Sequence, residues 1–222
     1  MRQEWLEGLQ RISLNTPTTV ALASGAVSSV VTLAWITASK ARERKRQRSD
    51  TALELALSLE RYARTCRIMM HRAAWAAAER SNSEASKRAS IPPFAYPDGV
   101  QWDILSRKVV SELREYPATV HAAREYVEAF REFAEPIDVC AQVEFECAKV
   151  AISALALART TRRRHGAAAW KLGAKDSALE RELVDFTAKA GEQRNAASER
   201  RADSVVAGQA RKQPRAEPSF EA

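Results

Sequence analysis

"VALASGAVSSVVTLAWITASKARERKRQRSD", residues 20–50, changes at Lys40 from an uncharged to a strongly basic sequence. No charged residue lies between Arg11 and Lys40. Of the 22 residues 18–39, fourteen are apolar or Gly and eight are Ser or Thr. At about 1.5 Å per residue, a helix of this length measures about 33 Å, close to the bilayer's hydrocarbon thickness of about 30 Å. The stretch therefore predicts a transmembrane helix over residues 17–39, with Pro17 at the first helical position.

The basic residues that follow the apolar run predict how the chain is oriented. Residues 40–48 contain six Lys and Arg and one Glu, a net charge of +5. Because the cytoplasmic flank of a membrane span carries the excess of Lys and Arg, we expect the chain after residue 48 to be cytoplasmic. Residues 1–16 then form a short flank on the other side. The polybasic residues are Lys40, Arg42, Arg44, Lys45, Arg46 and Arg48.

Two other interpretations of this stretch fit the sequence less well. A cleaved signal peptide would have a basic leader, whereas the two Arg and two Glu of residues 1–39 cancel. A buried helix of a soluble protein would show a polar face, and the polar residues here are hydroxyls, which can bond back to the preceding helical turn. Small residues spaced by four, Ala21, Gly25 and Ser29, would also allow two such helices to associate.

The charge of the remaining chain argues against a nucleic-acid partner. The whole protein carries a net charge of +7, but residues 49–190 hold 21 basic and 20 acidic residues. A domain that binds a duplex normally carries its excess positive charge on the folded part. The partners that we expect are therefore the bilayer and another protein, or a second copy of the chain.

Apolar periodicity predicts an antiparallel helical bundle over residues 49–190. One apolar residue recurs every three or four positions from Ala52 to Ala77, with no Gly or Pro, so this helix is expected to continue directly from the membrane span. Further helices are predicted over about 102–116, about 118–134, about 138–165 and from Ser177. We expect Pro117 and Pro136 to end two of these helices, and Asp138 and Gly166 to cap the long one.

The last part of the chain has a different composition. From Gly191 onward Ala, Arg, Glu, Ser and Gln dominate, with two prolines and few large apolar residues. This composition predicts a disordered tail over residues 191–222. The expected fold class is thus all-α: a transmembrane helix, a cytoplasmic helical bundle and a disordered tail.

The segment "IPPFAYPDGVQW", residues 91–102, is the candidate interaction surface. It combines three prolines with Phe94, Tyr96 and Trp102. Aromatic side chains beside prolines can form a preformed surface for a partner. The same side chains could instead plug the end of the bundle, because an ordered proline-rich connection needs such anchoring. The sequence leaves both interpretations open.

Residues typical of catalysis or metal binding are scattered. The three cysteines form no Cys-x-x-Cys pair, and Cys140 and Cys147 fall on an apolar stripe, which predicts buried, reduced thiols. The histidines His71, His121 and His165 are far apart in sequence, and there is no Gly-rich phosphate loop or Gly-x-Ser-x-Gly elbow. We therefore expect no enzymatic activity, no cofactor and no metal.

The order of these features resembles a group of small bacterial membrane-anchored proteins of uncharacterised function. The resemblance covers about residues 20–170 and rests on the span, the basic stop, "LERYARTC" (residues 59–66) and "IPPFAYPDGVQWDIL" (residues 91–105). It implies a single-pass protein of the bacterial inner membrane and brings no activity with it. Our main hypothesis is a non-enzymatic membrane protein with a cytoplasmic interaction domain. The alternatives are an envelope lysis or secretion accessory of a mobile element, with the opposite topology, and an enzyme that uses the histidines with nearby carboxylates.

Overall fold

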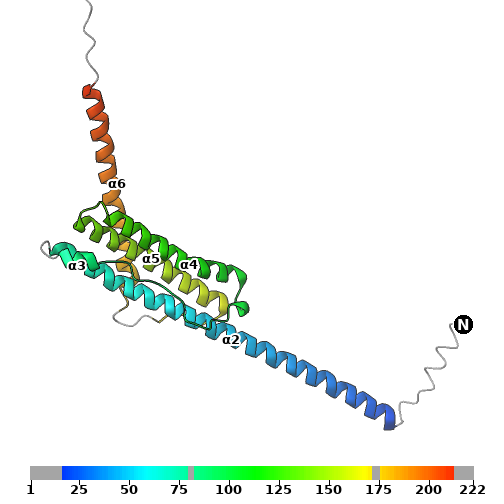
Figure 1. The fold of residues 1–222 in the computed structure, drawn as a ribbon. Helices are drawn as coiled ribbons and strands as arrows, with labels where there is room; N and C mark the ends of the chain where they lie inside the picture. Colours follow the sequence, from blue (N-terminus) through cyan, green and yellow to red (C-terminus); the bar gives the residue numbers. More distant parts are fainter. Residues whose placement is uncertain (1–16, 80–82, 172–175, 213–222) are drawn as a thin grey trace, which may run out of the picture. The chain divides into compact units, whose positions relative to one another are not determined.

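The computed structural model describes residues 17–79, 83–171 and 176–212; for residues 17–30, 83 and 197–212 it describes only the backbone. The described residues form helices joined by connecting segments, without a strand (Figure 1). The elements are α2 (Pro17–Ala78), α3 (Ser83–Arg88), a 3₁₀ turn η1 (Trp102–Ile104), α4 (Arg107–Arg131), α5 (Pro136–His165) and α6 (Leu179–Lys212). The chain divides into two compact units, residues 1–49 and residues 50–222. The all-helical bundle predicted from the sequence is confirmed, and it belongs to the second unit.

Helix α2 begins at Pro17, as the sequence predicts, and continues without a break to Ala78. No Gly or Pro lies between residues 26 and 78, so nothing interrupts the backbone hydrogen bonding across the polybasic stretch. Within the second unit the predicted apolar stripe is buried from Ala52 to Ala73. Among the residues that the structure describes, no helix meets the length and hydropathy needed to cross a membrane. For residues 17–30 of the predicted span, the structure describes the backbone but not the side chains.

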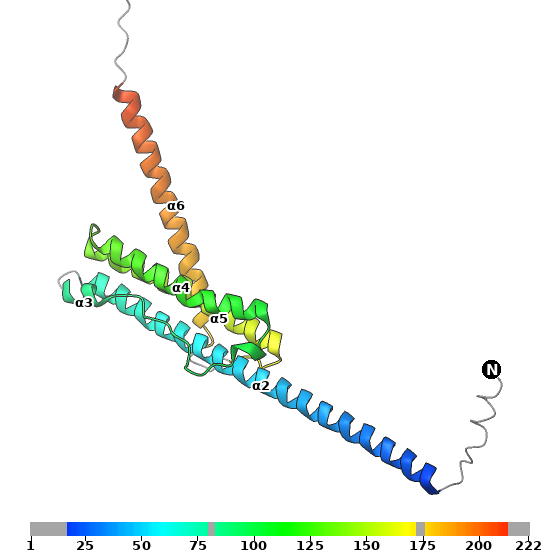
Figure 2. The same cartoon turned by 45° about the vertical axis from the view of Figure 1, so that its right-hand side comes forward.

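Helices α4 and α5 form an antiparallel hairpin that packs along the 50–78 part of α2, as two views of the bundle show (Figures 1 and 2). α5 is the most deeply packed helix, because its stripe from Cys140 to Ala158 is almost completely shielded from solvent. The first turns of α6 cover α5 with Leu179 and Leu183, both fully buried. A single hydrophobic core therefore joins α2, α4, α5 and the start of α6.

The predicted helix boundaries are wrong at four residues, Trp102, Pro117, Pro136 and Asp138. α4 does not end at Pro117 but runs through it to Arg131, while the predicted start at Trp102 is only the 3₁₀ turn. Pro136 does not end a helix but begins α5, with Glu135 as the N-cap. A proline at the first helical position costs nothing, because its missing N–H would have no intrahelical partner there. The predicted end of α5 is confirmed: Gly166 has a left-handed conformation (φ 66°), and basic residues fill the last turn.

The predicted disordered tail also differs from the structure. α6 begins at Leu179, two residues after the predicted cap Ser177, and continues to Lys212. Most of residues 191–212 are good helix formers such as Ala, Arg, Glu and Gln, and both prolines of the tail lie beyond Lys212. The low hydrophobicity of residues 191–212 was therefore not sufficient to predict disorder, because helix propensity also matters. Residues 213–222 of the predicted tail lie outside the described residues.

A tertiary hydrogen bond explains how α4 passes through Pro117. Proline has no N–H, so the carbonyl four residues earlier, that of Leu113, loses its normal helical donor. The Tyr96 hydroxyl donates a hydrogen bond to this same Leu113 carbonyl oxygen at 2.9 Å. Leu113 itself is fully buried, where an unsatisfied carbonyl would be costly. The connection between α3 and α4 thus supplies the donor that α4 lacks.

This arrangement predicts the effect of removing one hydroxyl. Tyr96→Phe should lower the free energy of unfolding by about 1–2 kcal/mol, because the Leu113 carbonyl is left without a donor. In a Pro117→Ala background the amide of residue 117 can bond that carbonyl, so the same substitution should cost about 1 kcal/mol less. Urea unfolding of the full chain in detergent micelles, followed by circular dichroism, measures the four variants of this cycle.

Tyr62→Phe is the matched control for the cycle. The Tyr62 hydroxyl donates to the Pro92 carbonyl, which does not depend on Pro117, so its removal should cost the same in both backgrounds. An equal cost of Tyr96→Phe in the wild-type and in the Pro117→Ala background would contradict the compensation that we describe.

Candidate functional site

The candidate interaction segment packs against the bundle as a strap. We use the name strap for residues 91–105, which connect α3 to α4. Its ends are anchored by the buried side chains of Ile91 and Leu105. Between them Phe94 and Tyr96 enter a ring cluster with Tyr62 of α2 and Tyr116 of α4. The ring centroids lie 4.8 Å apart for Tyr62–Phe94 and for Phe94–Tyr96, and 5.0 Å for Phe94–Tyr116.

Hydroxyl groups of the cluster satisfy backbone carbonyls in the interior. Tyr62 donates to the Pro92 carbonyl and Tyr116 to the Val150 carbonyl, each at 2.9 Å. Burial raises the pKa of Tyr62, Tyr96 and Tyr116 well above the ordinary value of a phenol, so all three remain protonated donors. The inward position of Phe94 and Tyr96 is the arrangement that the plug interpretation expects. An interaction role for these two side chains stays a prediction.

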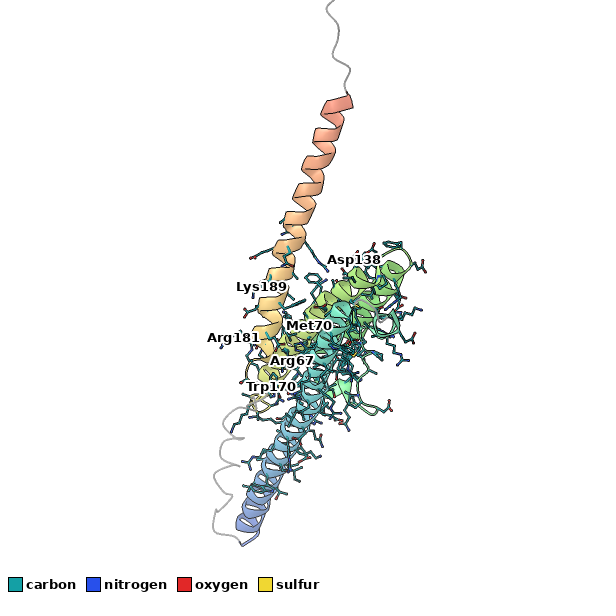
Figure 3. All side chains as sticks on the ribbon, turned by 90° about the vertical axis from the view of Figure 1, so that its left-hand side faces the viewer. Arg67, Met70, Asp138, Trp170, Arg181 and Lys189 are labelled. Carbon is teal, nitrogen blue, oxygen red and sulfur yellow. The ribbon has the colours of Figure 1, made fainter. Side chains whose placement is uncertain are left out.

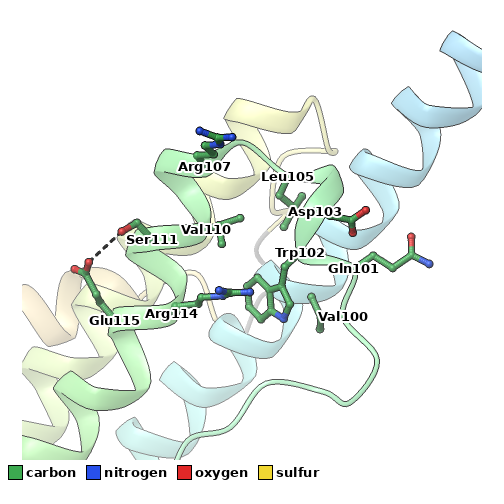
Figure 4. A pocket seen from close by; sticks show the side chains of 10 residues that line it. All are labelled: Val100, Gln101, Trp102, Asp103, Leu105, Arg107, Val110, Ser111, Arg114 and Glu115. Carbon is green, nitrogen blue, oxygen red and sulfur yellow. Dashed lines mark hydrogen bonds between the residues drawn. The ribbon is translucent and has the colours of Figure 1, made fainter.

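Trp102 differs from the other two candidate residues because it also lines an open groove. The groove has a volume of about 1020 Å³ and lies between η1 and the first turns of α4 (Figure 4). The Arg114 guanidinium lies 5.5 Å from the centroid of the indole ring, and the ring centroids of Trp102 and Tyr96 are 5.4 Å apart. The lining residues are Val100, Gln101, Trp102, Asp103, Leu105, Arg107, Val110, Ser111, Arg114 and Glu115.

The groove offers groups for recognition. An indole face stacked with a guanidinium can bind planar or aromatic groups, and Arg107 adds a second cation. Asp103 and Glu115 balance these charges, and the Ser111 hydroxyl donates to the Glu115 carboxylate at 3.1 Å. The side chains that line this groove include neither His nor Cys. The aromatic and charged groups make the groove a candidate binding site.

The polybasic residues all lie on α2, and their side chains are exposed. Glu43, the one acidic residue among them, accepts a hydrogen bond from Gln47 one helical turn later, at 3.1 Å. The stretch therefore presents a row of solvent-exposed cations on a continuous helix.

The histidines do not form a common site. His71 of α2 pairs with Glu182 of α6 at 2.7 Å, and His121 of α4 pairs with Glu125 at 3.1 Å on its own helix. His165 is the last residue of α5. Among the described residues no group of three or more His, Cys, Asp or Glu could hold a metal ion. The arrangement that an enzyme based on His71 and His121 would need is thus not found in the described part of the chain.

The three cysteines are free and buried, as the sequence predicts. Cys147 shares a hydrogen bond with Cys66, and this bond together with burial raises the pKa of the Cys147 thiol. Burial raises the pKa of Cys140 as well. Neutral thiols without solvent access are poor nucleophiles, so Cys140 and Cys147 act as small apolar side chains of the core.

Sequence reasoning missed a buried ion pair. Arg162, which in sequence belongs to the basic end of α5, forms two hydrogen bonds to Glu60 of α2, at 2.8 and 3.0 Å. Both side chains are almost completely shielded, with 6% and 1% of their surface exposed. Arg162 also donates to the Ala168 carbonyl at 2.6 Å, which fixes the chain just after the helix. No local pattern identifies this pair, because 102 residues separate its members.

Comparisons of the chain with protein-family models, with curated proteins and with solved structures found no match.

Breaking the buried pair should be costly. Glu60→Ala leaves the Arg162 guanidinium buried without its carboxylate and should lower the free energy of unfolding by about 3–5 kcal/mol. The double variant Glu60→Leu/Arg162→Met should recover most of this loss, because both buried charges are then removed. Thermal and urea unfolding of the full chain in detergent micelles measures the difference.

The pair between Arg159 and Glu180 is the matched control, since it is also held by two hydrogen bonds, at 2.9 and 2.6 Å, but is exposed. Glu180→Ala should cost no more than about 1 kcal/mol. Similar losses of unfolding free energy for Glu60→Ala and Glu180→Ala would show that burial of the Glu60–Arg162 pair does not raise the cost of breaking it.

Proposed function

We propose that this chain is a non-enzymatic, single-pass protein of the bacterial inner membrane, with a cytoplasmic helical domain that binds another protein. The proposal rests on the order in which exposed apolar and exposed basic side chains follow one another along one helix. On α2, a run of exposed apolar side chains is followed directly by a run of exposed basic ones.

The apolar side chains at the end of the proposed span support a bilayer as their environment. Val31 and Leu33 are each 62% exposed and Trp35 is 70% exposed, so the described part of the chain leaves most of their surface uncovered. Contact with water costs about 25 cal/mol per Å² of apolar surface, whereas lipid tails remove that cost. Trp35 lies close to the basic residues, where an indole favours the headgroup interface.

Hydroxyl groups of the same segment are satisfied within the helix, as a span requires. Thr37 donates to the Ala34 carbonyl and Ser39 to the Ile36 carbonyl, each at 2.9 Å. A hydroxyl that bonds the preceding turn adds no unpaired polar group in lipid. This supports the interpretation that Thr37 and Ser39, at the end of the proposed span, are compatible with insertion.

The binding role of the domain rests on its charge balance and on its rigid, mixed surfaces. The domain carries almost no net charge, which argues against a nucleic acid. Its groove beside Trp102 and Arg114 presents recognition groups on well-packed supports. These features favour a protein partner that is held at the membrane surface.

Topology tests the proposal. Replacing the six polybasic residues with Gln should remove the orientation signal, because residues 1–39 carry no net charge to substitute for it. In spheroplasts treated with protease, the wild-type domain should be protected and a substantial fraction of the six-Gln variant should be digested. Immunoblotting against a C-terminal tag measures the protected fraction.

A second six-Gln variant controls for the loss of positive charge. It replaces exposed basic residues of the bundle: Lys87, Lys108, Arg163, Arg164, Lys171 and Arg181. This control should remain as protected as the wild type. Full protection of the polybasic variant would show that the stretch is not the topology signal. Digestion of the wild-type domain would favour the opposite topology of an envelope accessory.

A further inference from the structure

An exposed aromatic cluster lies where α4 ends and α5 begins. The rings of Tyr126 and Phe130 are stacked with centroids 6.3 Å apart, and Phe133 meets Phe130 edge-on at 5.4 Å. Phe133 is 77% exposed and Tyr126 is 53% exposed. Ile137, on the first turn of α5, is 45% exposed. We name Tyr126, Phe130, Phe133 and Ile137 the aromatic tip.

The aromatic tip is held in place by Arg131. Its guanidinium donates to the carbonyls of Ser86, Lys87 and Ala89, at 3.2, 3.3 and 2.6 Å, at the end of α3. These contacts hold the α4–α5 turn against α3, and the two elements lie at the same end of the bundle in Figure 1. A cation at a helix C-terminus also satisfies carbonyls that lack helical donors. Because the support is fixed, a ligand would spend little free energy on ordering the tip.

Acidic side chains surround the aromatic tip. Residues 124–138 contain five acidic and two basic residues. One of the two, Arg131, is directed to the α3 carbonyls and to Glu128. Glu132, Glu135 and Asp138 are exposed, and none of them forms an ion pair with a described residue. Figure 3 marks Asp138 at the end of the bundle where α5 begins. Lys87 of α3 adds one exposed amine at this end, and the acidic side chains still outnumber the basic ones.

We propose that the aromatic tip binds a basic, apolar segment of another protein. The exposed rings provide an apolar contact and cation–π acceptors for Lys or Arg, and the three exposed carboxylates provide complementary charge. A second copy docking tip to tip would oppose like charges. An anionic bilayer surface would be repelled for the same reason. This inference rests on the proposed function, because it names the kind of partner that the interaction domain binds.

A direct binding measurement tests the proposal on the full chain. The protein is reconstituted in nanodiscs of zwitterionic lipid, with empty nanodiscs as the blank. The probes are three fluorescein-labelled amphipathic peptides with identical length and identical Leu and Trp positions, whose polar positions are all Lys, all Gln or all Glu. Fluorescence anisotropy should show that the Lys peptide binds at least about tenfold more tightly than the Glu peptide, with an affinity that falls as salt is raised.

Two variants assign this binding to the aromatic tip. Phe133→Ala should weaken binding of the Lys peptide about tenfold, as expected for an exposed aromatic anchor. The triple variant Glu132→Gln/Glu135→Gln/Asp138→Asn should weaken binding of the Lys peptide about tenfold. It should also remove most of the salt dependence of this binding. The controls are Ile68→Ala, which removes an exposed apolar side chain of α2, and Glu54→Gln/Asp98→Asn/Asp185→Asn, which removes three exposed acids elsewhere. Circular dichroism confirms that each variant is folded.

The outcomes separate this inference from the proposed function. Equal binding of the three peptides, binding to empty nanodiscs alone, no binding, or equal losses in tip and control variants would each overturn the inference. Tip-dependent self-association of the protein without peptide binding would also overturn it, in favour of a second copy as the occupant. None of these results changes the protease protection of the domain. Digestion of the wild-type domain in spheroplasts would leave the peptide result intact.

Discussion

The hydrogen bond from the Tyr96 hydroxyl to the Leu113 carbonyl is the contact on which the continuity of α4 depends. It supplies the donor that Pro117 removes, and so allows α4 to continue as one helix of 25 residues. A break at Pro117 would leave two short helices in place of the long partner that α5 requires. The same bond holds the strap against α4, with Phe94 beside it in the ring cluster. One hydroxyl thus couples the connection between α3 and α4 to the continuity of α4.

Polar groups in the interior are matched over long sequence distances. Tyr62 and Tyr116 donate to carbonyls of the strap and of α5, and Glu60 neutralises Arg162 between α2 and α5. Such contacts add modest net stability, but each strongly penalises arrangements in which one partner is left alone. These paired groups consequently favour the observed packing over arrangements that would separate them. The Trp102 groove and the aromatic tip both lie on the bundle, which fits the proposal that the domain binds another protein.

The features that depend on local patterns could be predicted from the sequence. The apolar stripes of α2 and α5, the start of α2 at Pro17 and the end of α5 at Gly166 follow from periodicity and from capping preferences. The passage of α4 through Pro117 could not be predicted, because its cause is a tyrosine 21 residues earlier that becomes a neighbour only in the fold. The burial of Arg162 could not be predicted either, because an arginine at a helix end and a buried arginine look alike in sequence. For Pro136, two local rules competed, and the preference for the first helical position prevailed. An interaction role for Phe94, Tyr96 and Trp102 stays a prediction, and the sequence did not indicate the aromatic tip as a surface. Phe94 and Tyr96 turn toward the bundle, whereas Phe133 is exposed just after α4 ends, where helical periodicity no longer applies.

Helix α2 links these observations to function, since it carries the apolar and basic runs as well as one side of the bundle core. The central claim is that the apolar part of this helix is covered by lipid. Alkaline carbonate extraction of membranes from cells that express the full chain measures this directly, because it strips proteins held only by charge or by other proteins. We predict that the protein stays in the membrane pellet after extraction. Its release into the supernatant would contradict the account.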